Sequence, residues 1–277
     1  FFSYRIFLFQ HVFLFFEHID RFYSTNGTAL MSNDKGITQY FGANLAEILS
    51  DKIKAACPNF DDTSYIEAVA GRVSELGYTQ RIELHARELQ KCLPPNYEKA
   101  IGILVDILGE ENPNETGMFS EYYWIMPIGK YVELYGLQDF SVSMKAIAEI
   151  TKRNTGEYAV RPFLKKYPDK AIKTLLNWAQ SENFHLRRLA SEGSRPKLPW
   201  STKLDTFIDN PEPVFNILSI LKEDEIKFVQ KSVANNITDY LKVNYDAARA
   251  LLREWSTTTN KNTLWIIKHA TRKIKIE

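Results

Sequence analysis

The sequence contains little cysteine: two of its 277 residues, Cys57 and Cys92. Both lie in polar, helix-like surroundings and form no Cys-x-x-Cys pair. A disulfide framework is therefore not indicated, and a reduced, cytoplasmic protein is the simplest interpretation. The histidines and cysteines lack the spacing of a zinc site, and no glycine-rich loop marks a nucleotide-binding turn. We expect neither a metal nor a cofactor.

The signals of β-hairpins are also missing, and so is an excess of charge of one sign. The formal net charge is +1, so composition argues neither for nor against a nucleic-acid partner. Charge is nevertheless uneven, because residues 157–203 contain ten lysines and arginines against four aspartates and glutamates. Such a block suits contact with phosphates, and a solvated helix face explains it about as well.

The N-terminal stretch, residues 1–30, differs from the rest of the chain. Ten phenylalanines and tyrosines fall between Phe1 and Tyr23, with polar residues among them. The apolar run is shorter than the roughly 20 residues of a membrane-spanning helix, and no clean cleavage site follows it. We expect residues 1–30 to lie outside the functional part, residues 31–277 to form a single domain, and the protein not to bind a membrane. A membrane anchor is the alternative.

From Ile37 onward, apolar residues recur with helical spacing, which predicts an all-α fold. Gly77 is expected to end one helix and Asn96 to begin another. Around Trp124 an aromatic-rich helix could stack on bases, although such a stripe is more often core. The expected helices are Tyr40–Leu49 continuing through Ile53–Ala56, Thr63–Leu76, Gln80–Cys92, Tyr97–Leu108, Phe140–Arg153, Asp169–Gln180, Pro213–Leu221 and Tyr245–Trp255.

Four segments align in one register, each with a cation at the end of a first helical turn: Arg161, Arg188, Lys231 and Lys268. These cations are 27, 43 and 37 residues apart, which is typical of helical repeats of about 40 residues. Stacked helix pairs form a curved solenoid with a concave surface. One cation per repeat would make that surface positive. The alternative, cations on exposed helix faces, does not require a shared register.

The most unusual stretch is residues 184–200, which combine charge, a helix stop and an aromatic side chain. Arg188 and Glu192 lie four residues apart on one helical face. Gly193 is expected to end the helix by accepting a left-handed conformation. A basic, proline-stiffened segment then leads to Trp200. Fixed cations, a carboxylate and a large aromatic side chain this close together are unusual for packing alone.

Residues 184–200 read Phe-His-Leu-Arg-Arg-Leu-Ala-Ser-Glu-Gly-Ser-Arg-Pro-Lys-Leu-Pro-Trp. They resemble the signature of the bacterial alkylpurine DNA glycosylases built from HEAT-like helical repeats, specifically the C-type 3-methyladenine branch. Glu-Tyr-Ala-Val-Arg-Pro-Phe from Glu157 and Ser-Val-Ala-Asn-Asn-Ile-Thr-Asp up to Asp239 are also similar to that branch. The resemblance covers about Ile37 to Lys273. It implies an all-α, right-handed solenoid of HEAT-like antiparallel helix pairs with a concave DNA-binding face.

The resemblance further implies a monofunctional DNA glycosylase. Such an enzyme hydrolyses the N-glycosidic bond of N3-alkylated bases, 3-methyladenine or 3-methylcytosine, in double-stranded DNA and leaves an abasic site. We expect it to act as a monomer, and no immunoglobulin-like domain is expected at the C-terminal end. Two other interpretations are a scaffold of HEAT repeats that binds DNA or a protein partner, and a catalytically silent reader of DNA structure.

Three carboxylates, Glu157, Glu192 and Asp239, are the expected catalytic residues. Breaking the glycosidic bond of a cationic base develops oxocarbenium character on the sugar, which a fixed carboxylate stabilises. A carboxylate could also position or deprotonate the attacking water. Spacing alone favours the alternative, in which the acids only pair with neighbouring arginines, as Glu192 would with Arg188. The resemblance favours the catalytic role.

The expected DNA or lesion contacts follow from the resemblance and from the register of the repeats. By the resemblance, Arg188 and Arg195 hold the DNA backbone and Trp200 packs beside the lesion, where a cationic base is attracted to the indole face. Gln230 stands where the family usually has an arginine. This departure affects the expected contacts with the DNA backbone near Asp239. The further expected contacts are Arg161, Arg187, Lys231, Asn235, Lys268 and Trp124.

Overall fold

The computed structural model describes residues 35–117 and 119–272. The chain divides into two units, Phe1–Gly36 and Ile37–Glu277. Every described helix except the start of the first belongs to the second unit. The expectation for residues 1–30 concerns a stretch that lies outside the described residues.

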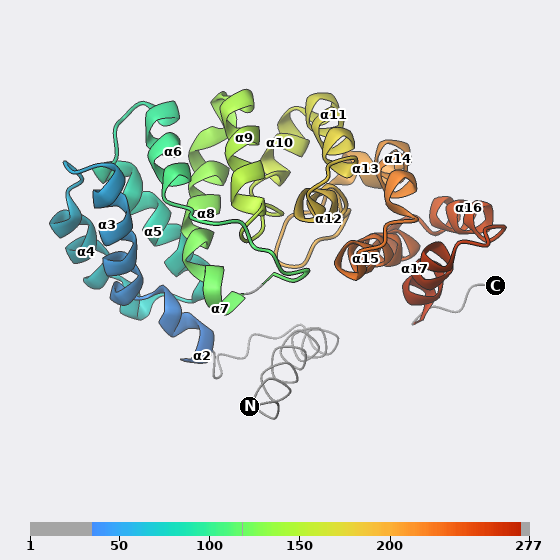
Figure 1. Ribbon diagram of the computed structural model, residues 1–277, viewed down its shortest axis with the longest axis horizontal. Helices are drawn as coiled ribbons and strands as arrows, with labels where there is room; N and C mark the ends of the chain where they lie inside the picture. Colours follow the sequence, from blue (N-terminus) through green and yellow to red (C-terminus); the bar gives the residue numbers. More distant parts are fainter. Residues whose placement is uncertain (1–34, 118, 273–277) are drawn as a thin grey trace. The chain divides into compact units, whose positions relative to one another are not determined.

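Within the described residues every regular element is helical, which confirms the predicted all-α fold (Figure 1). The N-terminal elements are α2 (Lys35–Thr38), η1 (Gln39–Phe41), α3 (Ala43–Ala56), α4 (Asp62–Ala70), η2 (Val73–Glu75), α5 (Tyr78–Cys92), α6 (Tyr97–Asp106), α7 (Phe119–Tyr122), η3 (Tyr123–Ile125), α8 (Met126–Tyr135), η4 (Gly136–Gln138) and α9 (Phe140–Thr151). The C-terminal elements are α10 (Arg161–Lys166), α11 (Pro168–Ala179), α12 (Phe184–Gly193), α13 (Asp205–Asp209), α14 (Glu212–Leu221), α15 (Lys227–Val243), α16 (Tyr245–Trp255) and α17 (Lys261–Thr271).

Local sequence signals account for where many of these helices begin. Six described helices follow an asparagine or aspartate whose side chain accepts a hydrogen bond from a backbone N–H of the first turn. Asn96 does so for α6, as predicted, with the backbone N–H of Lys99 at 2.9 Å. Such caps contribute typically about 1 kcal/mol each.

Two predictions about glycines are wrong. Gly77 does not end a helix but is the N-cap of α5, because α4 already stops at Ala70 and η2 intervenes. Gly193 is the last residue of α12, and the described residues with positive φ are Gly109 and Trp200. A Cβ on Gly193 would lie 2.6 Å from Cγ1 of Val160. Gly193 therefore permits close packing and does not supply a left-handed turn.

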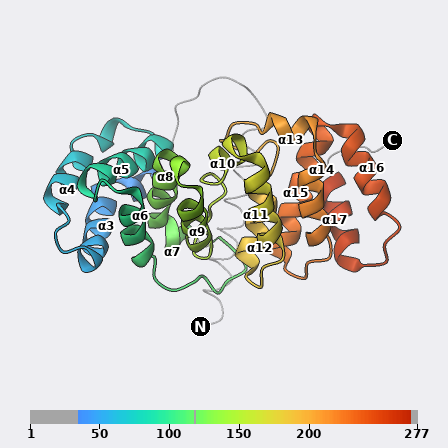
Figure 2. The same cartoon turned by 90° about the horizontal axis from the view of Figure 1, so that it is seen from above.

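The helices of the second unit pack as consecutive pairs. In Figure 1, α11, α14 and α16 form one row and α12, α15 and α17 form a second row beside it, and Figure 2 shows the same succession from above. Helix α15 packs against both α12 and α17. The predicted stacking of helix pairs is confirmed.

Apolar packing between α12 and α15 holds the two helices in a fixed relation. Leu189 and Ala190 of α12 and Val233 and Ile237 of α15 are fully buried. Burial of a side chain of leucine or isoleucine size contributes about 1.5–3 kcal/mol relative to exposure. Polar groups near the ends of this buried seam are therefore carried on a rigid base.

Candidate active site

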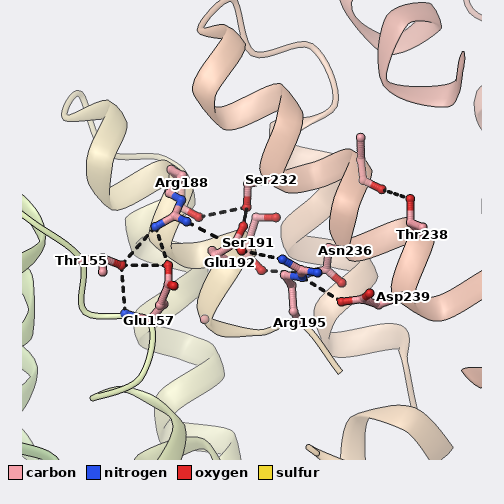
Figure 3. A network of polar contacts seen from close by, with 12 residues as sticks. Thr155, Glu157, Arg188, Ser191, Glu192, Arg195, Ser232, Asn236, Thr238 and Asp239 are labelled. Atoms are coloured by element: carbon pink, nitrogen blue, oxygen red, sulfur yellow. Dashed lines mark hydrogen bonds and ion pairs between the residues drawn. The ribbon is translucent and has the colours of Figure 1, made fainter. Parts of the chain in front are cut away.

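The three predicted carboxylates come together at the meeting point of α12, α15 and the turn before α10 (Figure 3). Glu157 lies in the turn that precedes α10, Glu192 in the last turn of α12 and Asp239 in the second half of α15. Arg188 and Arg195 alternate with them, so that five charged side chains form one row. We call these five residues the acid–arginine row.

Short ion pairs join the members of the acid–arginine row. Nη1 of Arg188 lies 2.6 Å from Oε2 of Glu157, and Nη1 of Arg195 lies 2.7 Å from Oε1 of Glu192. Nε of Arg195 is 2.8 Å from Oδ2 of Asp239. The pair expected from four-residue spacing, Arg188 with Glu192, is longer at 3.7 Å. The close partner of Glu192 is therefore Arg195, which lies beyond the end of the helix.

Two hydroxyl groups complete the hydrogen bonding of the acids. The Thr155 hydroxyl donates to Oε2 of Glu157 at 2.9 Å, and the Ser232 hydroxyl donates to Oε2 of Glu192 at 2.7 Å. We did not predict either residue. A sequence signal exists for Ser232, because it lies seven residues before Asp239, which is about two helical turns along one face.

The acid–arginine row is largely screened from solvent and carries one more negative than positive charge. Side-chain exposure is 8% for Glu192 and for Asp239, 11% for Arg195, 12% for Glu157 and 16% for Arg188. Charges are costly to bury unless they are paired and hydrogen-bonded. The unbalanced third carboxylate makes the row attractive to a cation.

The pKa values of the two most buried acids are shifted in opposite directions. Burial acts to raise the pKa of Glu192, but Arg195 and Arg188 outweigh it and lower this pKa to about 2. For Asp239, burial prevails over the attraction of Arg195, and its pKa is raised above the usual 3.8. Glu192 is therefore a permanent anion at neutral pH, whereas Asp239 is the acid more able to exchange a proton.

Trp200 lies in the segment that follows α12 and has an unusual backbone conformation. Its φ is 59°, and its side chain is 55% exposed. This φ is uncommon and strained for a non-glycine residue, and it persists only where the surrounding structure holds it. The Tyr78 ring of α5 lies 6.4 Å from the Trp200 ring, centroid to centroid. An exposed aromatic side chain thus stands on the same segment that supplies Arg195.

Two of the other expected contact residues, Arg161 and Arg187, bind groups of the protein itself. Arg161 is 2% exposed and donates hydrogen bonds to backbone carbonyl groups. Arg187 pairs with Asp224 at 2.6 Å and donates to the carbonyl oxygens of Ser181 and Glu182. The burial of Arg161 contradicts the expectation that it contacts DNA directly, whereas the DNA contact of Arg187, whose side chain is 19% exposed, stays a prediction. Equal register in the repeats does not make a cation accessible.

The remaining expected residues lie at or near the surface. Lys231 and Asn235 of α15 are half-buried, and Lys268 of α17 is exposed. Trp124 is half-buried and lies beneath Lys52, whose Nζ is 4.4 Å from the centroid of its ring. Trp124 therefore packs against α3, and its contact with DNA stays a prediction.

The described residues offer neither a cluster of metal ligands nor a membrane-spanning helix. Nowhere in them do three His, Cys, Asp or Glu side chains gather in a way that could hold a metal ion. The described helices also include none long and apolar enough to cross a membrane.

Comparison with known proteins identifies relatives. Residues 151–274 match the family model of the DNA alkylation repair enzymes. The uncharacterised protein YhaZ of Bacillus subtilis (strain 168) is 35% identical over 239 residues, which are 85% of this chain and 64% of YhaZ. The chain thus spans slightly less than two thirds of that relative.

A solved structure is similar over the same length. It is the Pseudomonas fluorescens alkylpurine DNA glycosylase AlkC bound to DNA containing an abasic site analog. The TM-score is 0.77 at 29% identity, and the match covers 87% of this chain and 65% of AlkC. This likeness confirms the predicted HEAT-like helical-repeat fold. Residues 151–274 are therefore similar to the DNA alkylation repair enzymes, and the chain is similar over most of its length to a solved alkylpurine DNA glycosylase.

Proposed function

We propose that the protein is a monofunctional DNA glycosylase that hydrolyses the N-glycosidic bond of N3-alkylated bases in double-stranded DNA and leaves an abasic site. The observation that carries this proposal is the acid–arginine row, in which three carboxylates from three separate parts of the chain meet beside two arginines. The similarity to an alkylpurine DNA glycosylase supports the same activity.

The charge of the row suits a cationic target. An N3-alkylated purine carries positive charge, and its departure develops positive charge on the sugar. Carboxylates that are already oriented stabilise that charge without reorganising during the reaction. Because Arg188 and Arg195 hold the acids, the site keeps its anions in place in the absence of DNA.

The two shifted pKa values support different roles for Glu192 and Asp239. Glu192, with its pKa lowered to about 2, acts as the permanent anion beneath the developing oxocarbenium ion. Asp239, with its raised pKa, acts as the base that orients and deprotonates the attacking water. Glu157, bound by Thr155 and Arg188, supplies negative charge at the end of the acid–arginine row opposite Asp239.

The rest of the proposed site binds DNA. Trp200 packs against the cationic base or its sugar, where the ring quadrupole attracts positive charge. Lys231 and Lys268 contact phosphates and release counterions on binding. The three acids pair with arginines, and we assign no lysine as a nucleophile, so a strand-cleaving lyase step is not part of the proposal. We further propose that the protein acts as a cytoplasmic monomer without a membrane partner.

Release of free base from methylated DNA tests the proposal. The full chain is incubated with DNA treated with a methylating agent, and the supernatant is analysed by chromatography for 3-methyladenine and 3-methylcytosine. The amide variants Glu157→Gln, Glu192→Gln and Asp239→Asn should each lower the rate of release while DNA binding is kept.

Glu88 offers a matched control for these amide variants. It is also a buried glutamate bound by two cations, Arg72 at 2.7 Å and Lys91 at 2.8 Å, but it belongs to α5. Glu88→Gln should leave base release unchanged. Absence of base release by the unaltered chain, or normal release by all three amide variants, would contradict the proposed function and favour a scaffold or a silent reader of DNA.

A further inference from the structure

Arg161 has an unusual set of hydrogen bonds for a residue that is almost fully buried. It is the first residue of α10 and is 2% exposed. Nη1 donates to the carbonyl oxygens of Gly193 at 3.1 Å and Arg195 at 2.8 Å, and Nη2 donates to that of Thr202 at 2.5 Å. One guanidinium group therefore joins both ends of residues 193–202.

Residues 193–202 have few hydrogen bonds of their own. Within this stretch the backbone N–H of Ser201 donates to the carbonyl of Leu198 at 3.2 Å. Pro196 and Pro199 have no N–H to donate. The left-handed φ of Trp200 persists only where the surroundings hold it. The conformation of the stretch must therefore be held from outside.

The backbone N–H of Leu204 provides one such contact, to the Pro196 carbonyl at 3.1 Å, and helix α10 provides further ones. The Gly193 carbonyl belongs to the last turn of α12, where carbonyl groups lack helical partners and a cation is favourable. Arginine suits this place because its planar fork carries five donors in a fixed geometry. Lys165, one turn further along α10, donates from Nζ to the Thr202 hydroxyl at 2.5 Å. Lys165 and Nη2 of Arg161 thus both bind Thr202 and hold the C-terminal end of the stretch.

We propose that Arg161 is a positioning residue for the proposed reaction. By clamping residues 193–202 it keeps Arg195 between Glu192 and Asp239 and keeps Trp200 in its exposed, left-handed conformation. Arg161 itself touches neither DNA nor the acids. The inference rests on the proposed function where base release is measured, and a spectroscopic measurement without DNA tests it independently.

The spectroscopic measurement uses the full chain labelled with 5-fluorotryptophan. The protein has five tryptophans, and loss of one fluorine resonance in Trp200→Phe assigns Trp200. Arg161→Lys keeps the charge and loses the fork, so the Trp200 resonance should shift or broaden while the other four stay in place. An unchanged Trp200 resonance in folded Arg161→Lys overturns the proposal.

Arg81 provides the matched control. It too donates to three backbone carbonyl groups, those of Leu76 at 2.8 Å, Thr38 at 3.1 Å and Ser74 at 3.4 Å, but these belong to the N-terminal repeats. Arg81→Lys should leave the Trp200 resonance unchanged. An equal change in both variants would overturn the proposal, because the effect would then be a general consequence of losing an arginine clamp.

Base release and DNA affinity give a second readout. A displacement of about 1 Å in a catalytic site costs about 100-fold in rate, so Arg161→Lys should slow release by roughly that factor. Its affinity for undamaged duplex should stay within about twofold, because no phosphate contact is lost. Weakened affinity with normal release would identify Arg161 as a DNA contact and overturn the proposal.

Coupling to Trp200 distinguishes positioning from an independent effect. If Arg161 acts through the stretch, the losses in Arg161→Lys and Trp200→Ala overlap. The relative rate of base release by the double variant should then be about tenfold higher than the product of the relative rates of the two single variants. A relative rate of the double variant equal to that product would overturn the proposal. If no form of the protein releases base, the proposed function fails, and the fluorine spectrum still decides the role of Arg161.

A surface variant keeps the test decisive if Arg161→Lys does not fold. Lys165 is exposed, so Lys165→Met removes the other contact to Thr202 with little risk to folding. A displaced or broadened Trp200 resonance in this variant supports the clamp at residues 193–202, and an unchanged one overturns it.

Discussion

Replacement of Glu192 by glutamine is the most informative single change, because it removes a charge and keeps the shape. The Glu192 side chain is 8% exposed and is bound by Arg195 at 2.7 Å and by the Ser232 hydroxyl at 2.7 Å. The amide can still accept a hydrogen bond through its oxygen. The variant therefore isolates the contribution of the negative charge to both stability and base release.

The size of the effect follows from the pKa of Glu192. Its fall from the usual 4.5 to about 2 corresponds to about 3 kcal/mol at about 1.4 kcal/mol per unit. Because the folded-state pKa is depressed, this contribution is fully present above the unfolded-state value of 4.5 and is lost as pH falls toward about 2. At neutral pH, Glu192→Gln should therefore be less stable than the unaltered chain by up to about 3 kcal/mol.

Asp239 contributes with the opposite sign. Its folded-state pKa is raised, so the stability it contributes is present at low pH and is lost as pH rises above its usual value. It therefore partly offsets the effect of Glu192 in the unaltered chain. The difference between the unaltered chain and Glu192→Gln reports the Glu192 charge, together with its influence on Asp239.

Urea unfolding followed by circular dichroism measures this difference at neutral pH and at several steps below about pH 5. The gap in the free energy of unfolding should close as pH falls, while base release by the variant stays low wherever it is folded. The reasoning is refuted if Glu192→Gln matches the unaltered chain in stability at neutral pH and keeps the same acid dependence. Glu192 would then not be held as an anion by Arg195 and Arg188.

Three further predictions address the other parts of the molecule. Because burial raises the pKa of Asp239, the rate of base release should increase with pH through that raised pKa. Asp239→Asn should abolish this acid limb of the pH–rate profile. A limb retained in the variant would show that another group is the base. Lys231→Ala and Lys268→Ala should each flatten the plot of log affinity against log salt by about one unit, measured by fluorescence anisotropy. Unchanged slopes for both would place the DNA surface elsewhere. A chain beginning at Met31 should match the full chain in melting temperature and base release and be more soluble, because exposed aromatic residues promote association. A large fall in melting temperature would show that residues 1–30 belong to the folded unit.

The sequence by itself determined the helices, because their signals are local. Apolar spacing and caps such as Asn96 act within a turn or two of the chain, and the predicted α16 has the bounds that the structure shows, Tyr245–Trp255. The carboxylates Glu157, Glu192 and Asp239 were also identified from the sequence, through their motifs. That they meet in one row is a finding of the structure.

Only the tertiary structure decided which partner each charged group has. Glu192 pairs closely with Arg195 because the chain turns back after α12, whereas helical spacing alone favours Arg188. Arg161 shares a register with Arg188, yet its position against residues 193–202 buries it among carbonyl groups. The register of the sequence repeats gives only the position of a residue within its own repeat. Whether its charge meets solvent, a carboxylate or a carbonyl depends on neighbouring segments that are distant in sequence, and packing alone brings those segments together.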